Sequence, residues 1–201
     1  MRRVASFSLA LIIGLSAIAS ACAEEARAKL AEPAATEPEE TASSALDKLY
    51  ARLARTQYPD EAVGILQAID QERMHSGSDT ADLLMAHAQQ ARSSADLPLA
   101  LQLFDSIVYL YPDWSEAWSE RATTRFQSGD VDGAMGDLAQ TLKREPRDVG
   151  ALAGLGSILL DAGQPEDALR AYDRALALAP AYEPLKEARA RAQTMVWSRE
   201  P

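Results

Sequence analysis

Residues 115–148 read SEAWSERATTRFQSGDVDGAMGDLAQTLKREPRD, and residues 149–182 follow at once as VGALAGLGSILLDAGQPEDALRAYDRALALAPAY. Both stretches are 34 residues long, and so is the stretch before them, residues 81–114. The thirty-second position of each stretch is a proline, namely Pro112, Pro146 and Pro180. A fixed period of this length predicts an array of repeats in place of a single globular core.

Four further positions agree in size across the three copies. The eighth and twentieth positions hold small residues, which let two helices of one copy approach closely. The fourth and twenty-fourth hold large residues, which fill the space above and below that contact. In chain order the four sets are Ala88, Ala122 and Gly156; Ala100, Ala134 and Ala168; Leu84, Trp118 and Leu152; and Phe104, Leu138 and Tyr172. Gly129 and Gly163 suit a turn between the helices, because glycine adopts positive φ without a steric penalty.

These positions make the chain resemble the tetratricopeptide repeat family over most of its length. The resemblance implies an all-α solenoid of antiparallel helix pairs, in which neighbouring repeats bury a shared core. Residues 43–74 fit the same register more loosely and are predicted as a degenerate first repeat. Residues 183–197 have apolar residues at helical spacing and are predicted as a C-terminal capping helix. The repeat domain is therefore expected to span residues 45–197.

The first 23 residues have the features of a secretory signal peptide. A basic start, MRR, precedes an apolar run that is too short for a comfortable transmembrane helix. Two processing routes fit this sequence. Cleavage after Ala23 gives a soluble periplasmic protein, whereas removal of residues 1–21 resembles bacterial lipoprotein processing and leaves Cys22 acylated. Either route predicts an exported protein of the periplasm, soluble or anchored to a membrane by lipid.

Composition limits the remaining partners. Residues 24–44 are rich in Ala, Glu, Pro and Thr and are predicted as a disordered linker.

The formal net charge is −10, and an acidic surface repels phosphate groups, so nucleic acid is not an expected partner. A membrane is expected to be reached only through acylation of Cys22. That residue is the only cysteine, which excludes an intramolecular disulfide.

No group of residues points to catalysis, a cofactor or a metal. His87 occupies an inward position of its repeat and is expected in the core. His75 lies in the connection before the second repeat, without carboxylate or cysteine partners at metal-ligand spacing. The run GALAGLG at residues 150–156 lacks a preceding strand and the glycine spacing of a dinucleotide loop. The chain is therefore predicted not to be an enzyme and to hold neither cofactor nor metal.

In the family, the second, fifth, ninth, twelfth and thirteenth positions of each repeat line a concave groove. Members that hold the terminal carboxylate of a peptide have Lys and Asn at the fifth and ninth positions, and no repeat here has that pair, so this ligand class is not expected. The small residues of the fourth repeat either leave room for a partner segment or permit tight curvature of the array. The resemblance implies these partner-binding residues: Met85, Gln89, Arg92, Ser119, Thr123, Phe126, Gln127, Ala153, Ser157 and Leu160.

Two arginines depart from the family pattern. Arg121 and Arg125 stand at the seventh and eleventh positions, where Leu and Tyr are usual. A buried guanidinium needs a partner, and the nearby candidates are Asp130, Asp132 and Asp137. Structural ion pairing is favoured over a ligand-binding role for both arginines.

Residues 118–123 and 145–156 also look like those of small exported tetratricopeptide proteins of Gram-negative bacteria, which supports export. The expected function is a protein–protein interaction adaptor or scaffold of the bacterial cell envelope, which binds a segment of an unknown partner in the groove. Two alternatives remain. One is a lipid-anchored envelope assembly factor, and the other is a structural protein that self-associates through the capping helix and Trp197.

Overall fold

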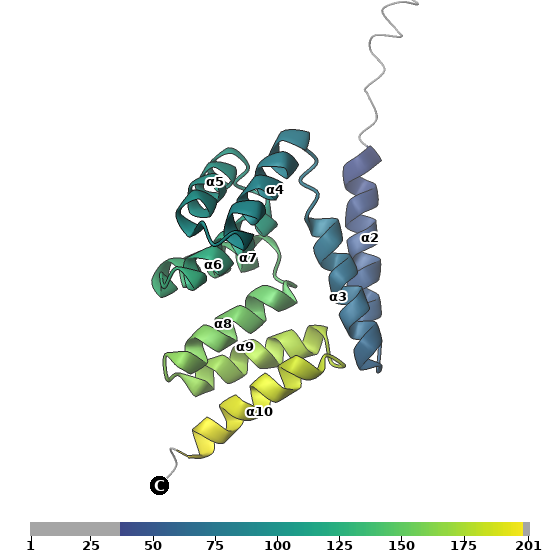
Figure 1. Cartoon of the computed structure of the whole chain (residues 1–201). Helices are drawn as coiled ribbons and strands as arrows, with labels where there is room; N and C mark the ends of the chain where they lie inside the picture. The colour runs from purple at the N-terminus through teal and green to yellow at the C-terminus, as the bar shows by residue number, and fades with distance from the viewer. Residues whose placement is uncertain (1–36, 199–201) are drawn as a thin grey trace, which may run out of the picture. The chain divides into compact units, whose positions relative to one another are not determined.

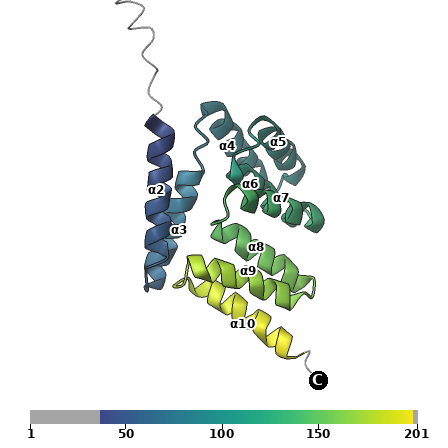
Figure 2. The ribbon, with the colours of Figure 1, turned by 180° about the vertical axis from the view of Figure 1, so that it is seen from behind.

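A computed structural model describes residues 37–198, with side chains from residue 45 onward. Within this range the regular structure is entirely α-helical, as the repeat pattern predicts, and Figures 1 and 2 show α4 to α10 following one another as antiparallel pairs. The helices are α2 (Glu37–Leu53), α3 (Pro59–Arg73), α4 (Asp79–Ser93), α5 (Leu97–Leu110), α6 (Ser115–Gln127), α7 (Val131–Arg144), α8 (Val149–Asp161), α9 (Pro165–Leu178) and α10 (Glu183–Trp197).

The pairs α4–α5, α6–α7 and α8–α9 coincide with residues 81–114, 115–148 and 149–182, and α10 coincides with the predicted cap. We call the first helix of each pair the A helix and the second the B helix. Each B helix also packs on the next A helix, because α5 contacts α6, α7 contacts α8 and α9 contacts α10. The array is therefore continuous from α4 to the cap.

The small residues lie where the two helices of a pair meet. The residues at the eighth and twentieth positions of all three repeats are buried. Gly156 shows how close that contact is, since a Cβ atom there would lie 2.7 Å from the ring of Tyr172. The turns also follow the sequence. Gly129 and Gly163 have φ of 87° and 72°, and Ala95, at the same position of the preceding repeat, is forced to φ 61°.

The side of an A helix is normally covered by the preceding B helix. The third and tenth positions of α6, α8 and α10 are accordingly buried: Ala117 and Thr124, Ala151 and Ile158, and Leu185 and Ala192. In α4 the matching residues are Leu83, which is 58% exposed, and Gln90, which is also exposed. The expectation that His87 lies in the core is wrong for the same reason, because this residue is exposed on the uncovered side of α4.

The start of the first hairpin differs from the sequence prediction. Helix α2 begins at Glu37, so the last eight residues of the predicted disordered segment 24–44 are helical. The sequence Glu-Pro-Glu-Glu at residues 37–40 accounts for this start, since proline and acidic residues favour the first turn of a helix. The predicted signal peptide, Cys22 and residues 24–36 lie outside the described residues.

The position of the first hairpin also differs from that of a first repeat. Helices α2 and α3 contain the expected apolar residues. Within residues 37–198, each later B helix packs on the A helix that follows it, but α3 does not pack along α4 in this way. Instead, Tyr50, Leu53 and Ile69 join an apolar cluster with Val149 and Leu152 of α8. The hairpin therefore attaches to the later repeats, through this apolar cluster and through ion pairs such as that of Arg73 with Asp148.

Candidate functional site

A largely apolar surface of the array lies between the A helices α6 and α8. A cavity of about 370 Å³ opens there, and we call it the α6–α8 groove. Its lining is uncharged throughout: Ser119, Ala122, Thr123 and Phe126 of α6, Leu138 of α7, and Gly150, Gly154, Ser157 and Ile158 of α8. Such a mixture of apolar contacts and a few hydroxyl groups suits an uncharged polypeptide segment better than an ion.

Helical spacing explains why these residues share one surface. In α6 the lining residues recur at intervals of three and four, and those of α8 do the same, so each set forms one face of its helix. The start of α8 is fixed by Asp148, whose carboxylate accepts a hydrogen bond of 2.8 Å from the Ala151 amide. Gly150 and Gly154 add no side chain, which keeps the α8 wall open.

Hydrophobic and polar groups have different places in the groove. Leu138 and Ile158 are buried and form the apolar floor of the groove, while Phe126, another lining residue, is 46% exposed. Thr123 donates its hydroxyl hydrogen to the Ser119 carbonyl oxygen, at 3.1 Å. The groove can therefore offer apolar area and hydroxyl groups to a segment, but no fixed charge.

Nine of the ten predicted partner-binding residues divide into three groups. Ser119, Thr123, Phe126 and Ser157 line the α6–α8 groove, and Gln127 is exposed next to Phe126. Ala153 and Leu160 are half-buried and pack against the cluster that contains the first hairpin. Gln89 and Arg92 both bond to Glu120 of α6, so their polar groups are already engaged. The partner-binding role of these residues remains a prediction.

Met85 does not line an open surface, contrary to the prediction. It is 3% exposed and belongs to an apolar cluster against which Met74, at the end of α3, also packs. Met85 was assigned by its position in the repeat, and that position does not show that α3 ends over it. The floor of the groove, Leu138 and Ile158, was not predicted, although the apolar residues at those positions were a usable signal.

Arg121 and Arg125 form the predicted structural ion pairs. Arg121 donates to both carboxylate oxygens of Asp137, at 2.9 and 2.7 Å, and Arg125 lies 3.1 Å from the same carboxylate. Arg125 also lies 3.7 Å from Asp130. Asp105 of α5 is a further partner that the sequence analysis missed, 2.8 Å from Arg121, whereas Asp132, the third candidate, is exposed.

A second ionic cluster attaches the first hairpin to the array. Arg73, the last residue of α3, lies 2.6 Å from Asp148 before α8 and 2.8 Å from Glu116 of α6, and all three are buried. The Trp114 indole donates a hydrogen bond of 2.9 Å to the Arg73 carbonyl oxygen. Burial raises the pKa of Glu116 to about 7, which Arg73 opposes and the neighbouring carboxylates reinforce.

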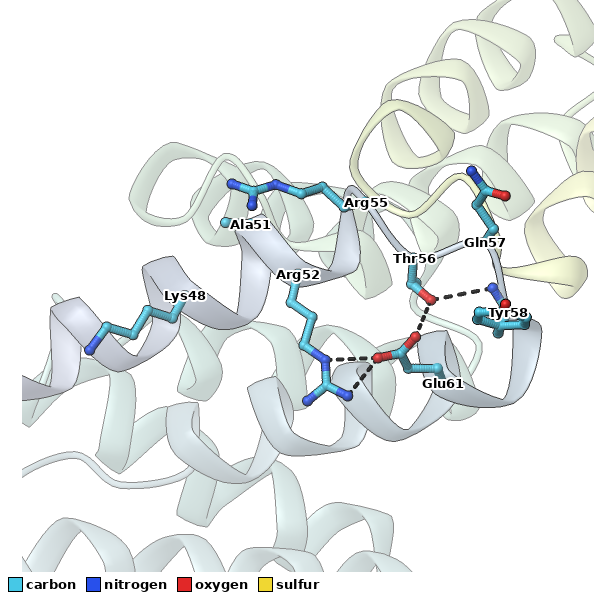
Figure 3. Close-up of a pocket in the computed structure, with 8 residues that line it drawn as sticks. All are labelled: Lys48, Ala51, Arg52, Arg55, Thr56, Gln57, Tyr58 and Glu61. Atoms are coloured by element: carbon cyan, nitrogen blue, oxygen red, sulfur yellow. Dashed lines mark hydrogen bonds and ion pairs between the residues drawn. The ribbon is translucent and has the colours of Figure 1, made fainter.

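A second candidate surface lies at the α2–α3 turn (Figure 3). It is an open hollow of about 590 Å³ that Lys48, Arg52 and Arg55 line together with Glu61. Figure 3 shows Arg52 and Thr56 turned toward the Glu61 carboxylate, with Lys48 and Arg55 extending away from it. The Thr56 hydroxyl, 2.5 Å from Glu61, and Arg52 lower the pKa of that carboxyl group. These contacts hold the turn and account for Arg52, Thr56 and Glu61 without a ligand.

Within residues 37–198, no group of three or more His, Cys, Asp or Glu side chains is placed to hold a metal ion. His75, which is exposed before the start of α4, lies 3.6 Å from the carboxylate of the half-buried Asp82. None of the helices in the described range is both long and apolar enough to cross a membrane.

Comparison with known proteins agrees with the repeat pattern. Residues 119–183 match the family model described as tetratricopeptide repeat. A TPR repeat-containing protein of Rhizobium etli is 39% identical over 136 residues, which cover 68% of this chain and 67% of that protein.

Solved structures of the same fold include complexes with peptides. One is the first TPR domain of Spaghetti (RPAP3) bound to the HSP90 peptide SRMEEVD, with a TM-score of 0.55, 16% identity, and coverage of 58% of this chain and 92% of that one. Another is the Yersinia enterocolitica type III secretion chaperone SycD in complex with a peptide of the translocator YopD, with a TM-score of 0.52, 20% identity, and coverage of 60% and 92%. By its repeats, its fold and its bacterial relative, the chain belongs to the tetratricopeptide repeat family.

Proposed function

We propose that this protein is an adaptor of the bacterial cell envelope, which holds a segment of a partner protein in the α6–α8 groove. The observation that carries the proposal is the groove itself, an exposed and uncharged hollow on the A helices with an apolar floor. A partner of this kind needs no catalytic group, and Arg121 and Arg125, which flank the groove residues Ala122 and Phe126 in α6, are engaged in ion pairs.

The chemistry of the groove favours an uncharged segment from within a partner chain. A terminal carboxylate would need a cation to pair with it, and every residue that lines the groove is neutral. The HSP90 peptide SRMEEVD that Spaghetti binds is acidic and is therefore a poor model for this ligand. Because the chain has a net charge of −10, basic residues on either side of the bound segment would speed the encounter.

Peptides selected from a random library, with both termini blocked so that they carry no terminal charge, would serve as the probe for this proposal. Selected peptides would be measured by fluorescence anisotropy against the wild type, Gly154→Leu and Gly136→Leu. Gly154 lines the groove, whereas Gly136 is an exposed residue of α7 with open space around it. We expect Gly154→Leu to weaken binding about tenfold or more, the cost of excluding a few buried apolar contacts, and Gly136→Leu to leave it unchanged. Equal binding by all three proteins would place the binding site elsewhere.

The envelope location rests on residues 1–23, whose composition is that of a secretory signal peptide. Fractionation of cells that express the full chain tests export directly. Cys22→Ser separates the two forms of the proposal, because only a lipid-anchored assembly factor would lose its membrane association and its labelling with radioactive palmitate. A protein that stays in the cytoplasm would contradict both forms.

Self-association is a second candidate, favoured by the end of the capping helix. Trp197 is 64% exposed and the neighbouring Met195 is 38% exposed, so α10 presents apolar area beyond the array. Sedimentation velocity over a range of concentrations would detect oligomers. Oligomers that disappear in Trp197→Ser would support this candidate, and a monomer at all concentrations would remove it.

A further inference from the structure

The uncovered side of α4 is the place that the B helix of a preceding repeat would occupy. The third and tenth positions are buried in α6, α8 and α10, each of which follows a B helix. Only in α4, among the described A helices and the cap, are both positions exposed, with Leu83 at 58%. A leucine so exposed at a position that is elsewhere buried indicates that an apolar contact is missing on this side.

The first hairpin has the sequence to make that contact. Leu46, Leu49 and Leu53 of α2 and Ala62 and Leu66 of α3 stand at the repeat positions that form a core. In the observed position they pack in the apolar cluster shared with α8, so stacking on α4 would exchange that contact for another. The connection from α3 to α4 is also long enough. It has five residues, 74–78, whereas four residues link α5 to α6, α7 to α8 and α9 to α10. Gly77, with φ of 80°, gives this connection a residue that can change conformation at low cost.

In the observed position the hairpin instead covers part of the A-helix surface. Met74 packs on the cluster that contains Met85, and its sulfur lies 3.6 Å from the Gln89 side-chain nitrogen. Met85 stands at the fifth position, and its counterparts Ser119 and Ala153 are only half-buried. The end of α3 thus accounts for the burial of Met85.

In addition to the apolar cluster that Tyr50, Leu53 and Ile69 share with α8, two ionic contacts hold the hairpin there. One is the buried cluster of Arg73 with Glu116 and Asp148. The other joins Arg147 to Asp47 of α2, at 2.6 Å, with the Arg147 guanidinium 4.2 Å from the Tyr50 ring. Contacts that depend on buried charges are lost abruptly when one partner is removed, since an unpaired buried charge is strongly unfavourable.

We propose that the α2–α3 hairpin is a movable first repeat with two positions on the array. In the observed position it lies against α6 and α8 and covers Met85. In the second it stacks on the side of α4, covers Leu83 and leaves Met85 open to a partner. The hairpin thereby regulates access to the A-helix surface of α4. Both positions are available to the free protein, so the movement can be tested without a partner.

Thiol labelling of the full chain tests both positions at once. With Cys22→Ser as background, single cysteines replace Met85, Leu83, the buried core residue Ile107 and the exposed residue Tyr109. Each is then combined with Arg73→Ala, or with Arg144→Ala as the matched control, since Arg144 bonds within the array to Gln140 and Pro112. Labelling rates report how often each thiol becomes accessible.

We expect Arg73→Ala to speed labelling of Met85→Cys about tenfold or more and to slow labelling of Leu83→Cys several-fold, with Ile107→Cys and Tyr109→Cys unchanged. Arg144→Ala should change none of them. If Arg73→Ala also speeds Ile107→Cys, the array itself has loosened, and Arg147→Ala, a milder change at the exposed contact, takes its place. Labelling of Met85→Cys that always follows Ile107→Cys would overturn the proposal. So would an opened Met85 with no added protection of Leu83.

Discussion

Replacing Gly156 by alanine should destabilise the protein, although alanine is the better helix former. A Cβ at this position would lie 2.7 Å from Cε1 and 2.9 Å from Cδ1 of Tyr172. Carbon atoms in contact are ordinarily about 3.5–4.0 Å apart, so the ring would have to move by roughly 1 Å. Tyr172 is 2% exposed and belongs to an apolar cluster, so a shift of its ring must displace neighbouring side chains.

The magnitude follows from two opposing effects. Overpacking of a core typically costs about 1–3 kcal/mol, and alanine in a helix regains about 1 kcal/mol over glycine. Three ring atoms within 3.0 Å of the added Cβ put the overpacking cost in the upper part of that range, about 2–3 kcal/mol, so the expected net loss is about 1–2 kcal/mol. Gly154→Ala provides the matched control two residues away, because its Cβ would lie 3.6 Å from the Leu138 side chain, an ordinary contact. That change should stabilise the protein by about 0.5–1 kcal/mol.

Urea unfolding followed by circular dichroism measures both changes through the transition midpoint. A second substitution identifies the cause. Tyr172→Leu reproduces the pairing of the preceding repeat, where Ala122 faces Leu138, so it should relieve the clash and make the double variant more stable than the sum of the two single changes. Gly156→Ala at or above wild-type stability, or an additive double variant, would refute the argument that the glycine is needed for the tyrosine.

Three further changes test other parts of the fold by the same unfolding assay. Ala95→Gly should stabilise by about 0.5–1 kcal/mol, because φ of 61° is unfavourable for alanine, and a loss of stability would contradict this. Tyr50→Phe should be neutral or stabilising by up to about 1–2 kcal/mol, since the buried Tyr50 hydroxyl has no hydrogen-bond partner; a clear loss would reveal a partner for that hydroxyl. Glu116 has a folded pKa of about 7, above its unfolded value, so its stabilising effect is complete below about pH 4.5 and is lost as the pH rises through 7. Glu116→Gln should therefore match the wild type near pH 5 and exceed it in stability near pH 8, and a constant difference at both values would show that this carboxyl group does not titrate there.

The repeats from α4 to α10 follow from sequence because each is fixed by local spacing. Small residues at the eighth and twentieth positions and a proline near the end specify one helix pair and its turn, whatever surrounds it. The same periodicity carries no information about where a pair attaches. Arg73 and Asp148 are 75 residues apart in the chain, and nothing in either local pattern announces their contact.

The errors at Met85 and His87 have that single origin. Both were placed by their position in a repeat that was assumed to follow a stacked neighbour. Because α3 ends over the A-helix surface, Met85 is covered, and because the preceding B helix, α3, does not pack along α4, His87 is exposed. One signal was available, since Met74 replaces the proline that closes each later repeat and marks a connection of a different kind.

The α6–α8 groove was predictable in part. The family positions identified Ser119, Thr123, Phe126 and Ser157, because the resemblance fixes which face of each A helix is open. The floor was missed, because it depends on the depth left by Gly150 and Gly154, and depth is a property of two helices together.

The central claim is that the α6–α8 groove receives a partner segment, and site-specific photocrosslinking in the cell envelope tests it most directly. A photoreactive residue would replace Ser157 within the groove or, as the matched control, the exposed Gly136 outside it. We predict that the Ser157 position crosslinks to a defined segment of another protein, and that Gly154→Leu in the same chain abolishes this product. A product that forms equally from Gly136, or that survives Gly154→Leu, would contradict the assignment of the groove as the binding site.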